Sequence, residues 1–188
     1  MIRETIVTTL SPDGVAHVAP MGATPIEEGW LLQPFRPSTT LDNFLATRCG
    51  VVNFTDDARI FAGCVTKRRP IWPTAPASEI PSVRLQAALS HHEVRVARVD
   101  GDGERPKLHC VVVAERIHRA FLGLNRAVAA VLEGAVLVSR LNMLPPEKID
   151  AEFAYLQIAI DKTAGPGELE AWQWLLDAVR DHRARAAS

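Results

Sequence analysis

The sequence lacks the short motifs by which common nucleotide-binding and hydrolytic enzymes are recognised. No GxGxxG follows a strand-like stretch and no GxxxxGK loop occurs, which excludes the usual dinucleotide and triphosphate loops. A GxSxG elbow and an HExxH helix are also missing. No side chain is therefore marked as the group that makes or breaks bonds. We expect either a binding protein or an enzyme whose cofactor carries the reaction.

Cysteine is scarce, and its three positions are far apart: Cys49, Cys64 and Cys110. An odd number of widely spaced cysteines argues against a disulfide framework, and their apolar neighbours indicate buried thiols in a reducing compartment. His91 and His92 are adjacent, and neighbouring strand residues point to opposite faces of a sheet. The two rings are therefore poorly placed to share a metal ion, and we expect no metal site.

An excess of charge and long apolar runs are absent too. The 21 basic and 22 acidic residues give a net charge of -1, so there is no bulk attraction for nucleic acid or an anionic membrane. No apolar run reaches the length of a membrane span, and residues 1–5 lack the parts of a signal peptide. We expect a cytoplasmic protein with neither partner, whose 188 residues are enough for a substantial core.

The most informative stretch, residues 29–53, predicts a strand, a basic turn, a short helix and a second buried strand. Trp30, Leu31 and Leu32 form an apolar run that ends before Pro37. Thr39 stands where a helix N-cap belongs, with Asp42 three residues later, the spacing of a capping box. The sequence therefore predicts a helix that begins directly after the turn.

The start of this helix is a candidate anion site. Unpaired amides and the helix dipole favour a negative group there, and the turn adds polar donors. These donors are Arg36, Ser38, Thr39 and Thr40. The alternative is that Thr39 and Asp42 satisfy the helix end themselves while Arg36 lies on the surface. Spacing alone leaves both interpretations open.

Two features of the first half bear on a ligand. Residues 2–22 predict a hairpin whose return strand ends at Met21 and Gly22, where the missing side chain would let a flat ligand approach the backbone. Strands are expected over residues 50–55 and 59–65. Asn53 is a polar side chain within the first of them, so it either ties two strands together or reaches a ligand.

The remaining segments are assigned more coarsely. The basic residues Lys67, Arg68 and Arg69 are typical of a solvated loop, or else approach a phosphate. Residues 70–81 contain four prolines and predict an ordered linker or lid, and residues 91–114 predict a hairpin. Helices are expected over residues 120–143, 147–163 and 168–185. Arg126 and Arg140 are polar exceptions in the first of these helices, and their role stays open.

Several short motifs occur in an order that resembles a known group of proteins. The segments are His-Val-Ala-Pro-Met-Gly at 17–22, Arg-Pro-Ser-Thr-Thr at 36–40, the helix with Asn43, and Val-Asn-Phe at 52–54. In this order they resemble the FMN-binding split-barrel proteins related to flavin reductases and flavoredoxin. More narrowly, Gly-Leu-Asn-Arg-Ala at 123–127 and Ser-Arg-Leu at 139–141 resemble the domain of unknown function 447 family of methanogens and of methylotrophs that use tetrahydromethanopterin.

The resemblance implies an α+β fold, an FMN-binding split β-barrel with a C-terminal helical segment. It implies a barrel domain over residues 1–116, and a helical subdomain over residues 117–188 packed on the barrel or on a dimer interface. It also implies a homodimer with FMN near the interface. The residues it assigns to FMN are Ala19, Pro20, Met21 and Gly22 along the ring, Arg36, Ser38, Thr39 and Thr40 at the phosphate, and Asn53 near the ribityl chain or ring.

Two functions follow as hypotheses. The first is a flavoprotein that passes hydride or electrons between a reduced nicotinamide and a small-molecule substrate, for which the resemblance suggests a pterin of C1 metabolism. The second is a non-catalytic carrier or assembly protein with the same barrel, supported by the lack of an evident acid, base or nucleophile. A catalytic residue is not predicted in either case.

Overall fold

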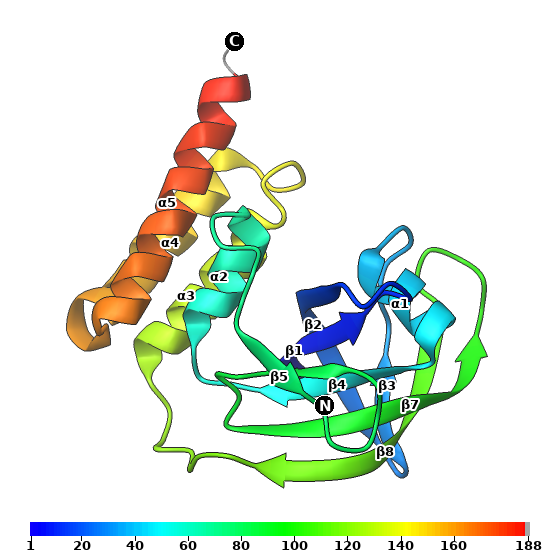
Figure 1. The fold of residues 1–188 in the computed structure, drawn as a ribbon. Helices are drawn as coiled ribbons and strands as arrows, with labels where there is room; N and C mark the ends of the chain where they lie inside the picture. Colours follow the sequence, from blue (N-terminus) through cyan, green and yellow to red (C-terminus); the bar gives the residue numbers. More distant parts are fainter. Residues whose placement is uncertain (187–188) are drawn as a thin grey trace. The chain divides into compact units, whose positions relative to one another are not determined.

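Six strands close into an antiparallel barrel in the order β1-β2-β3-β8-β7-β4 (Figure 1). The computed structural model describes residues 1–186. The barrel strands are β1 (Arg3–Leu10), β2 (Ala16–Ile26), β3 (Gly29–Leu32), β4 (Cys49–Phe54), β7 (Ser90–Asp100) and β8 (Lys107–Ile117). The first hairpin, β1–β2, and the second, β7–β8, confirm the predictions for residues 2–22 and 91–114. The α+β split-barrel class with C-terminal helices is confirmed.

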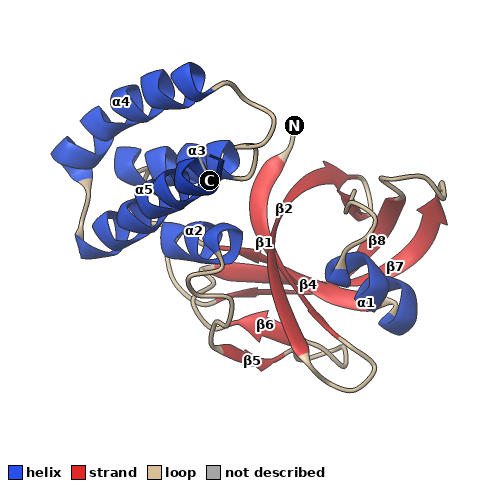
Figure 2. Cartoon of the chain, turned by 90° about the horizontal axis from the view of Figure 1, so that it is seen from above, coloured by secondary structure: helices blue, strands red, loops and turns tan. Residues whose placement is uncertain are grey.

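Alternating side chains fill the barrel. Successive strand residues point to opposite faces, and one set from each strand forms the core. These core residues include Val7, Leu32, Val52, Val94 and Leu108. Helix α1 (Thr39–Thr47) adds Leu41 and Phe44 to the same core, and Figure 2 shows it lying against the barrel strands. Burial of these two side chains therefore holds α1 against the sheet.

A second layer covers the outer face of β1 and β4. It consists of β5 (Thr74–Pro76) and β6 (Val83–Leu85), which pair antiparallel. Ile80, between them, packs with Cys49 and Val51 of β4. The predicted linker over residues 70–81 therefore contains a short strand. Its prolines hid the pattern because they interrupt any period, although proline is tolerated in an edge strand.

The remaining helices form a separate unit. They are α2 (Ala58–Thr66), α3 (Arg126–Val138), α4 (Pro146–Thr163) and α5 (Pro166–Ala186). Helix α2 contacts both α3 and α5 (Figure 1). The three predicted C-terminal helices are found, but the first begins at Arg126 because Asn125 caps it, its side-chain oxygen accepting from the Ala127 and Val128 amides.

The strand predicted over residues 59–65 is wrong, because this segment is helix α2. Asp57 is its N-cap and accepts from the Arg59 amide at 3.2 Å. Ile60 and Phe61 are buried, so the run is apolar enough to read as a buried strand. A short apolar run does not reveal its period, and only the cap and the packing partners distinguish helix from strand.

The chain divides into two compact units. The barrel unit contains residues 1–55 and 71–121, and the helical unit contains residues 56–70 together with the chain from residue 122. The division predicted at 116/117 stays a prediction. In this grouping residues 56–70 belong with the helices, and residues 187–188 of the predicted subdomain lie outside the described residues. Within residues 1–186, no helix is both long enough and apolar enough to cross a membrane.

Candidate functional site: an anion corner beside an open strand edge

Ser38, not Thr39, is the N-cap of α1. Its backbone is extended, with φ -157° and ψ 140°, and its hydroxyl accepts from the Leu41 amide at 3.2 Å. Its carbonyl accepts from the Asp42 amide at 3.0 Å. The predicted capping box from Thr39 to Asp42 is wrong by one residue. Three consecutive hydroxyl residues all suit the cap chemically, and the backbone conformation selects one of them.

Several donors at this helix start have no partner within residues 1–186, and of these Thr39 is exposed while Thr40 is 3% exposed. Across the described chain, residues 1–186, no group accepts a hydrogen bond from the amides or hydroxyls of Thr39 and Thr40. Arg36 is exposed, and no carboxylate of those residues pairs with it. The Ser38 hydroxyl accepts a bond as the cap but keeps its own hydrogen to donate. The corner is therefore electropositive and rich in donors.

A second arginine lies at the same corner. The Arg105 guanidinium lies 4.4 Å from the centre of the Phe35 ring and donates to the Gln33 carbonyl at 3.3 Å. The neighbouring Glu104 carbonyl accepts from the Arg36 amide at 2.7 Å. Sequence reasoning missed Arg105 because only the tertiary contact between the β7–β8 turn and residues 33–36 brings it here. The only sign of Arg105 in the sequence was that a basic residue occurs in that turn.

The segment Ala19, Pro20, Met21 and Gly22 lies on β2 and has an open edge. It pairs with β1 on one side, where Ala19 lies opposite Val7. On the other side, the ladder with β3 ends at Ala23 opposite Leu32. The chain leaves the sheet after Leu32 and reaches Arg36 four residues later. The open edge of β2 therefore begins opposite the end of the strand that leads into the anion corner, and α1 contacts β2.

Local contacts fix this segment of β2. The Thr5 hydroxyl donates to the Met21 carbonyl at 2.7 Å. A Cβ added to Gly22 would lie 2.9 Å from the Ile2 side chain. The first neighbour of Gly22 is thus Ile2, the second residue of the chain, which is itself largely exposed. The absence of a side chain at Gly22 therefore makes room for the Ile2 side chain, before any ligand is considered.

Asn53 is buried, and its amide is fully bonded within the barrel unit. Its oxygen accepts from the Leu85 amide at 2.8 Å. Its nitrogen donates to the Ile6 carbonyl at 2.9 Å and to the Thr8 hydroxyl at 3.1 Å. These are the contacts of the strand-tying alternative, because they join β4 to β1 and β6. We therefore leave Asn53 out of the ligand site proposed below.

The other basic residues singled out in the sequence, at positions 67–69, 126 and 140, lie in the helical unit. Arg68 pairs with Asp181 at 3.3 Å and with Asp177 at 3.8 Å, both on α5. Arg126 is the first residue of α3, and Arg140 follows the end of that helix, so the two do not share one helix. Ion pairs of this exposed kind contribute little to stability.

The barrel has the split-barrel fold that is also found in flavin reductases. Solved structures with this fold include the 2-nitrobenzoate 2-nitroreductase of Pseudomonas fluorescens, with 17% identity, a TM-score of 0.53, and coverage of 61% of this chain and 64% of that one. An NADH:FAD oxidoreductase of Streptomyces globisporus has 13% identity, a TM-score of 0.53, and coverage of 61% and 75%. At these identities the likeness shows the fold alone.

Family models identify the chain more narrowly. The N-terminal domain of the protein of unknown function DUF447 matches residues 3–119, and the C-terminal DUF447 model matches residues 125–177. The chain belongs to the DUF447 family, which confirms the narrower resemblance. Its restriction to methanogens and methylotrophs stays a prediction.

A solved member of this family covers nearly the whole chain. It is an FMN-bound protein from Methanosarcina mazei, with 20% identity, a TM-score of 0.81, and coverage of 94% of each chain. Barrel and helices together are therefore a shared fold. No curated protein sequence matches the chain.

Proposed function

We propose that the protein is an FMN-binding flavoprotein whose phosphate site is the anion corner at the start of α1. The observation that carries this proposal is the set of donors without partners there: the amides and hydroxyls of Thr39 and Thr40, and the Arg36 guanidinium. A phosphate dianion matches these donors and the helix dipole. Arg105, held over Phe35, adds a second positive charge at the same place.

The isoalloxazine ring belongs, in this proposal, along the open edge of β2. Backbone groups of Ala19, Pro20, Met21 and Gly22 lack a ladder partner on that side, so a flat ring with donors and acceptors on its rim matches them. The bound flavin of the Methanosarcina mazei relative supports the assignment of FMN. The role of this chain's residues is to hold the phosphate and orient the ring.

The activity we propose is electron transfer from a reduced nicotinamide to a small-molecule substrate. FMN, when bound, supplies the hydride and one-electron chemistry that the side chains lack. A pterin of C1 metabolism as the substrate rests on the family resemblance alone. We also propose a homodimer with FMN near its interface. Anaerobic mixing with NADH or NADPH tests the activity, and a bound flavin that neither reductant bleaches would contradict it.

Site variants test the phosphate position. We expect Arg36→Ala and Thr39→Ala each to weaken FMN binding by about 1–3 kcal/mol, roughly 5- to 150-fold in Kd, because each removes a donor to a charged group. Fluorescence titration of FMN measures this loss. Arg116→Ala is the matched control, since Arg116 is an exposed arginine near the end of β8 far from the β7–β8 turn. Equal affinity in all four proteins would place the phosphate elsewhere.

A further inference from the structure

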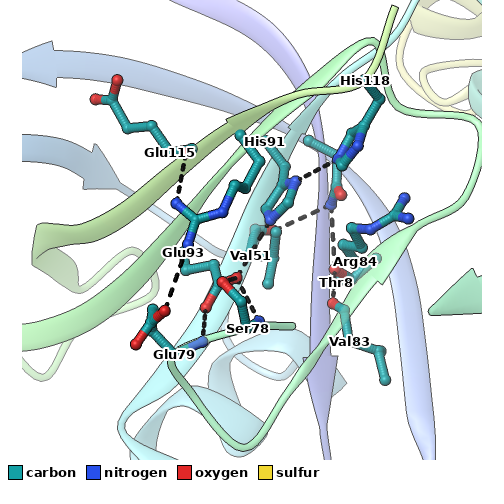
Figure 3. Close-up of polar contacts among 12 residues, drawn as sticks. Thr8, Val51, Ser78, Glu79, Val83, Arg84, His91, Glu93, Glu115 and His118 are labelled. Atoms are coloured by element: carbon teal, nitrogen blue, oxygen red, sulfur yellow. Dashed lines mark hydrogen bonds and ion pairs between the residues drawn. The ribbon is translucent and has the colours of Figure 1, made fainter. Parts of the chain in front are cut away.

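A polar cluster that the flavin proposal does not use lies on the outer face of β7. Glu93 and His91 point the same way from this strand and are 0% and 2% exposed. His92, between them, points inward, and its Nδ1 accepts from the Trp30 indole nitrogen at 3.0 Å. The third member, His118, follows β8 and is exposed. Figure 3 shows a continuous line of contacts from Glu93 through His91 to His118.

Glu93 is a permanent carboxylate. Burial by itself would raise its pKa, but one oxygen accepts from the Ser78 amide at 2.6 Å and from the Ser78 hydroxyl at 2.8 Å. The other oxygen accepts from the Glu79 amide at 2.7 Å. These bonds, together with one from His91, lower the pKa to about 2. The carboxylate therefore stays charged at pH values well above 2.

This carboxylate fixes the hydrogens of both imidazoles. A carboxylate can only accept, so the His91 Nε2, 3.3 Å from Glu93, carries the hydrogen. The His91 Nδ1 of the neutral ring then has a lone pair, and it lies 2.8 Å from the His118 Nε2. His118 must donate from Nε2. Its Nδ1 is left as a free base on an exposed ring.

Burial and neighbouring charges shift the pKa values of the two histidines. Partial burial lowers the pKa of His118, and the positive charge of Arg84 on β6 lowers it further. Burial lowers the pKa of His91, against the opposing effect of Glu93. Other charged side chains near the cluster are Glu79 and Arg116, which pair with each other at 3.3 Å, and Arg95, which donates to the Glu79 carbonyl at 3.3 Å.

Arg84 has no carboxylate partner. One of its nitrogens donates to the Leu85 carbonyl at 3.2 Å, and no acidic side chain among residues 1–186 forms an ion pair with it. Figure 3 shows it beside the His91–His118 pair. A cation without a counter-ion next to a free base suits a small molecule that carries both a negative charge and a transferable proton.

We propose that Glu93, His91 and His118 form a hydrogen-bonded triad, here called the relay, which stabilises a proton on His118 and, with Arg84, makes an acid–base site for a small carboxylate or similar anion. Arg84 holds the anionic group, and the Nδ1 of His118 takes a proton from the substrate, which keeps the electron pair of the broken bond. The positive charge formed on His118 is stabilised through its Nε2–H bond to His91 and through His91 by Glu93, which stays ionised. Release of the proton to water returns the ring to its first state.

The contacts exceed what holding the loop requires. Glu93 already fixes Ser78 and Glu79 by three hydrogen bonds. The His91 and His118 rings are nearly parallel, with an interplanar angle of 6°, and add nothing to that task. Through these two aligned rings, the negative charge of Glu93 acts on an exposed histidine. The relay requires no flavin, so its test is independent of the proposed function.

Nitrogen NMR of the histidine-labelled full chain tests the relay. We expect both His91 and His118 as Nε2–H tautomers at neutral pH, with His118 taking its proton at Nδ1. In Glu93→Gln the carboxamide can donate as well as accept, so His91 becomes a tautomer mixture and the pKa of His118 falls. Glu115→Gln is the control: it removes a carboxylate 3.7 Å from His92, outside the relay, and should leave His118 unchanged.

A second variant covers the case in which Glu93→Gln does not fold. His91→Phe keeps the ring shape and the Glu93 loop contacts but removes the acceptor for His118, which should then titrate as a tautomer mixture. An Nδ1–H tautomer of His118 in the wild-type protein would overturn the proposal. So would a His118 titration that is the same in the wild type and in the folded variants.

Acetate serves as the probe for the anion site. Added at constant ionic strength against sodium chloride, it should shift the His118 ring nitrogens saturably and raise the pKa of His118, because a bound anion offsets Arg84. Arg84→Gln should abolish the saturation. A linear shift equal to that of chloride, or saturation unchanged in Arg84→Gln, would contradict an anion site at this place.

Discussion

Individual buried polar side chains hold the layers of the barrel unit together. Asn53 joins three strands through one amide, and Glu93 holds the loop at Ser78 through one carboxylate. In each case the side chain satisfies backbone groups that burial has removed from water. The loss of such a group leaves its partners unsatisfied, which costs more than the bond itself contributes.

Asn53→Leu tests this at the residue scale. The leucine has a similar volume but leaves the buried Leu85 amide and the Ile6 carbonyl without these bonds, so we expect a loss of at least about 2 kcal/mol in the free energy of unfolding. Urea unfolding measures it. The control is Asn142→Leu, an exposed residue bonded to His182, which should cost below about 0.5 kcal/mol. Equal midpoints would contradict the account.

The ionisation of Glu93 predicts a pH dependence. Its pKa is about 2 in the folded protein and near 4.5 when unfolded, so the unfolded chain binds a proton first as the pH falls. The resulting stabilisation, roughly 3 kcal/mol, is complete above pH 4.5 and is lost as the pH falls toward 2. Glu93→Gln should remove this part of the acid dependence. An unchanged slope of unfolding free energy between pH 4.5 and 2 would refute the assignment.

At the element scale, helix α1 joins the core to the anion corner. Its inner face buries Leu41 and Phe44, while its first turn presents unpaired donors. The two roles belong to different residues. Ser38 satisfies the helix end, whereas Thr39 is exposed and its side chain forms no hydrogen bond within residues 1–186.

A pair of alanine variants separates these roles. Ser38→Ala removes the cap bond to the Leu41 amide and should lower the unfolding free energy by about 1 kcal/mol. Thr39→Ala should leave stability within about 0.5 kcal/mol while weakening FMN binding. Thermal unfolding without flavin compares the two. The reverse order of stability would restore Thr39 as the cap.

Elements with strong local signals were predictable from sequence. The two hairpins carry turn residues, with Gly14 and Gly101 at φ +79°, a conformation that suits glycine. Helix α2 was not predictable in the same way, because its apolar run fits a strand equally well and its packing partners lie far along the chain. Arg105 and His118 join their clusters only through tertiary contacts, which no spacing encodes.

At the scale of the whole molecule, one chain brings together a barrel unit and a helical unit, both matched by the DUF447 family models. The proposed flavin site is built entirely within the barrel unit, from the open edge of β2, the start of α1 and the β7–β8 turn. The family resemblance places such a site at a homodimer interface. Dimerisation and flavin binding are therefore expected together.

Gel filtration of the purified protein with excess FMN, monitored by flavin absorbance and light scattering, tests the central claim most directly. We predict that the yellow flavin elutes with the protein at the mass of two chains, about 41 kDa from 20.6 kDa per chain, and that Arg36→Ala elutes with much less of it. Protein that elutes colourless, with all the flavin in the small-molecule fraction, would contradict the account.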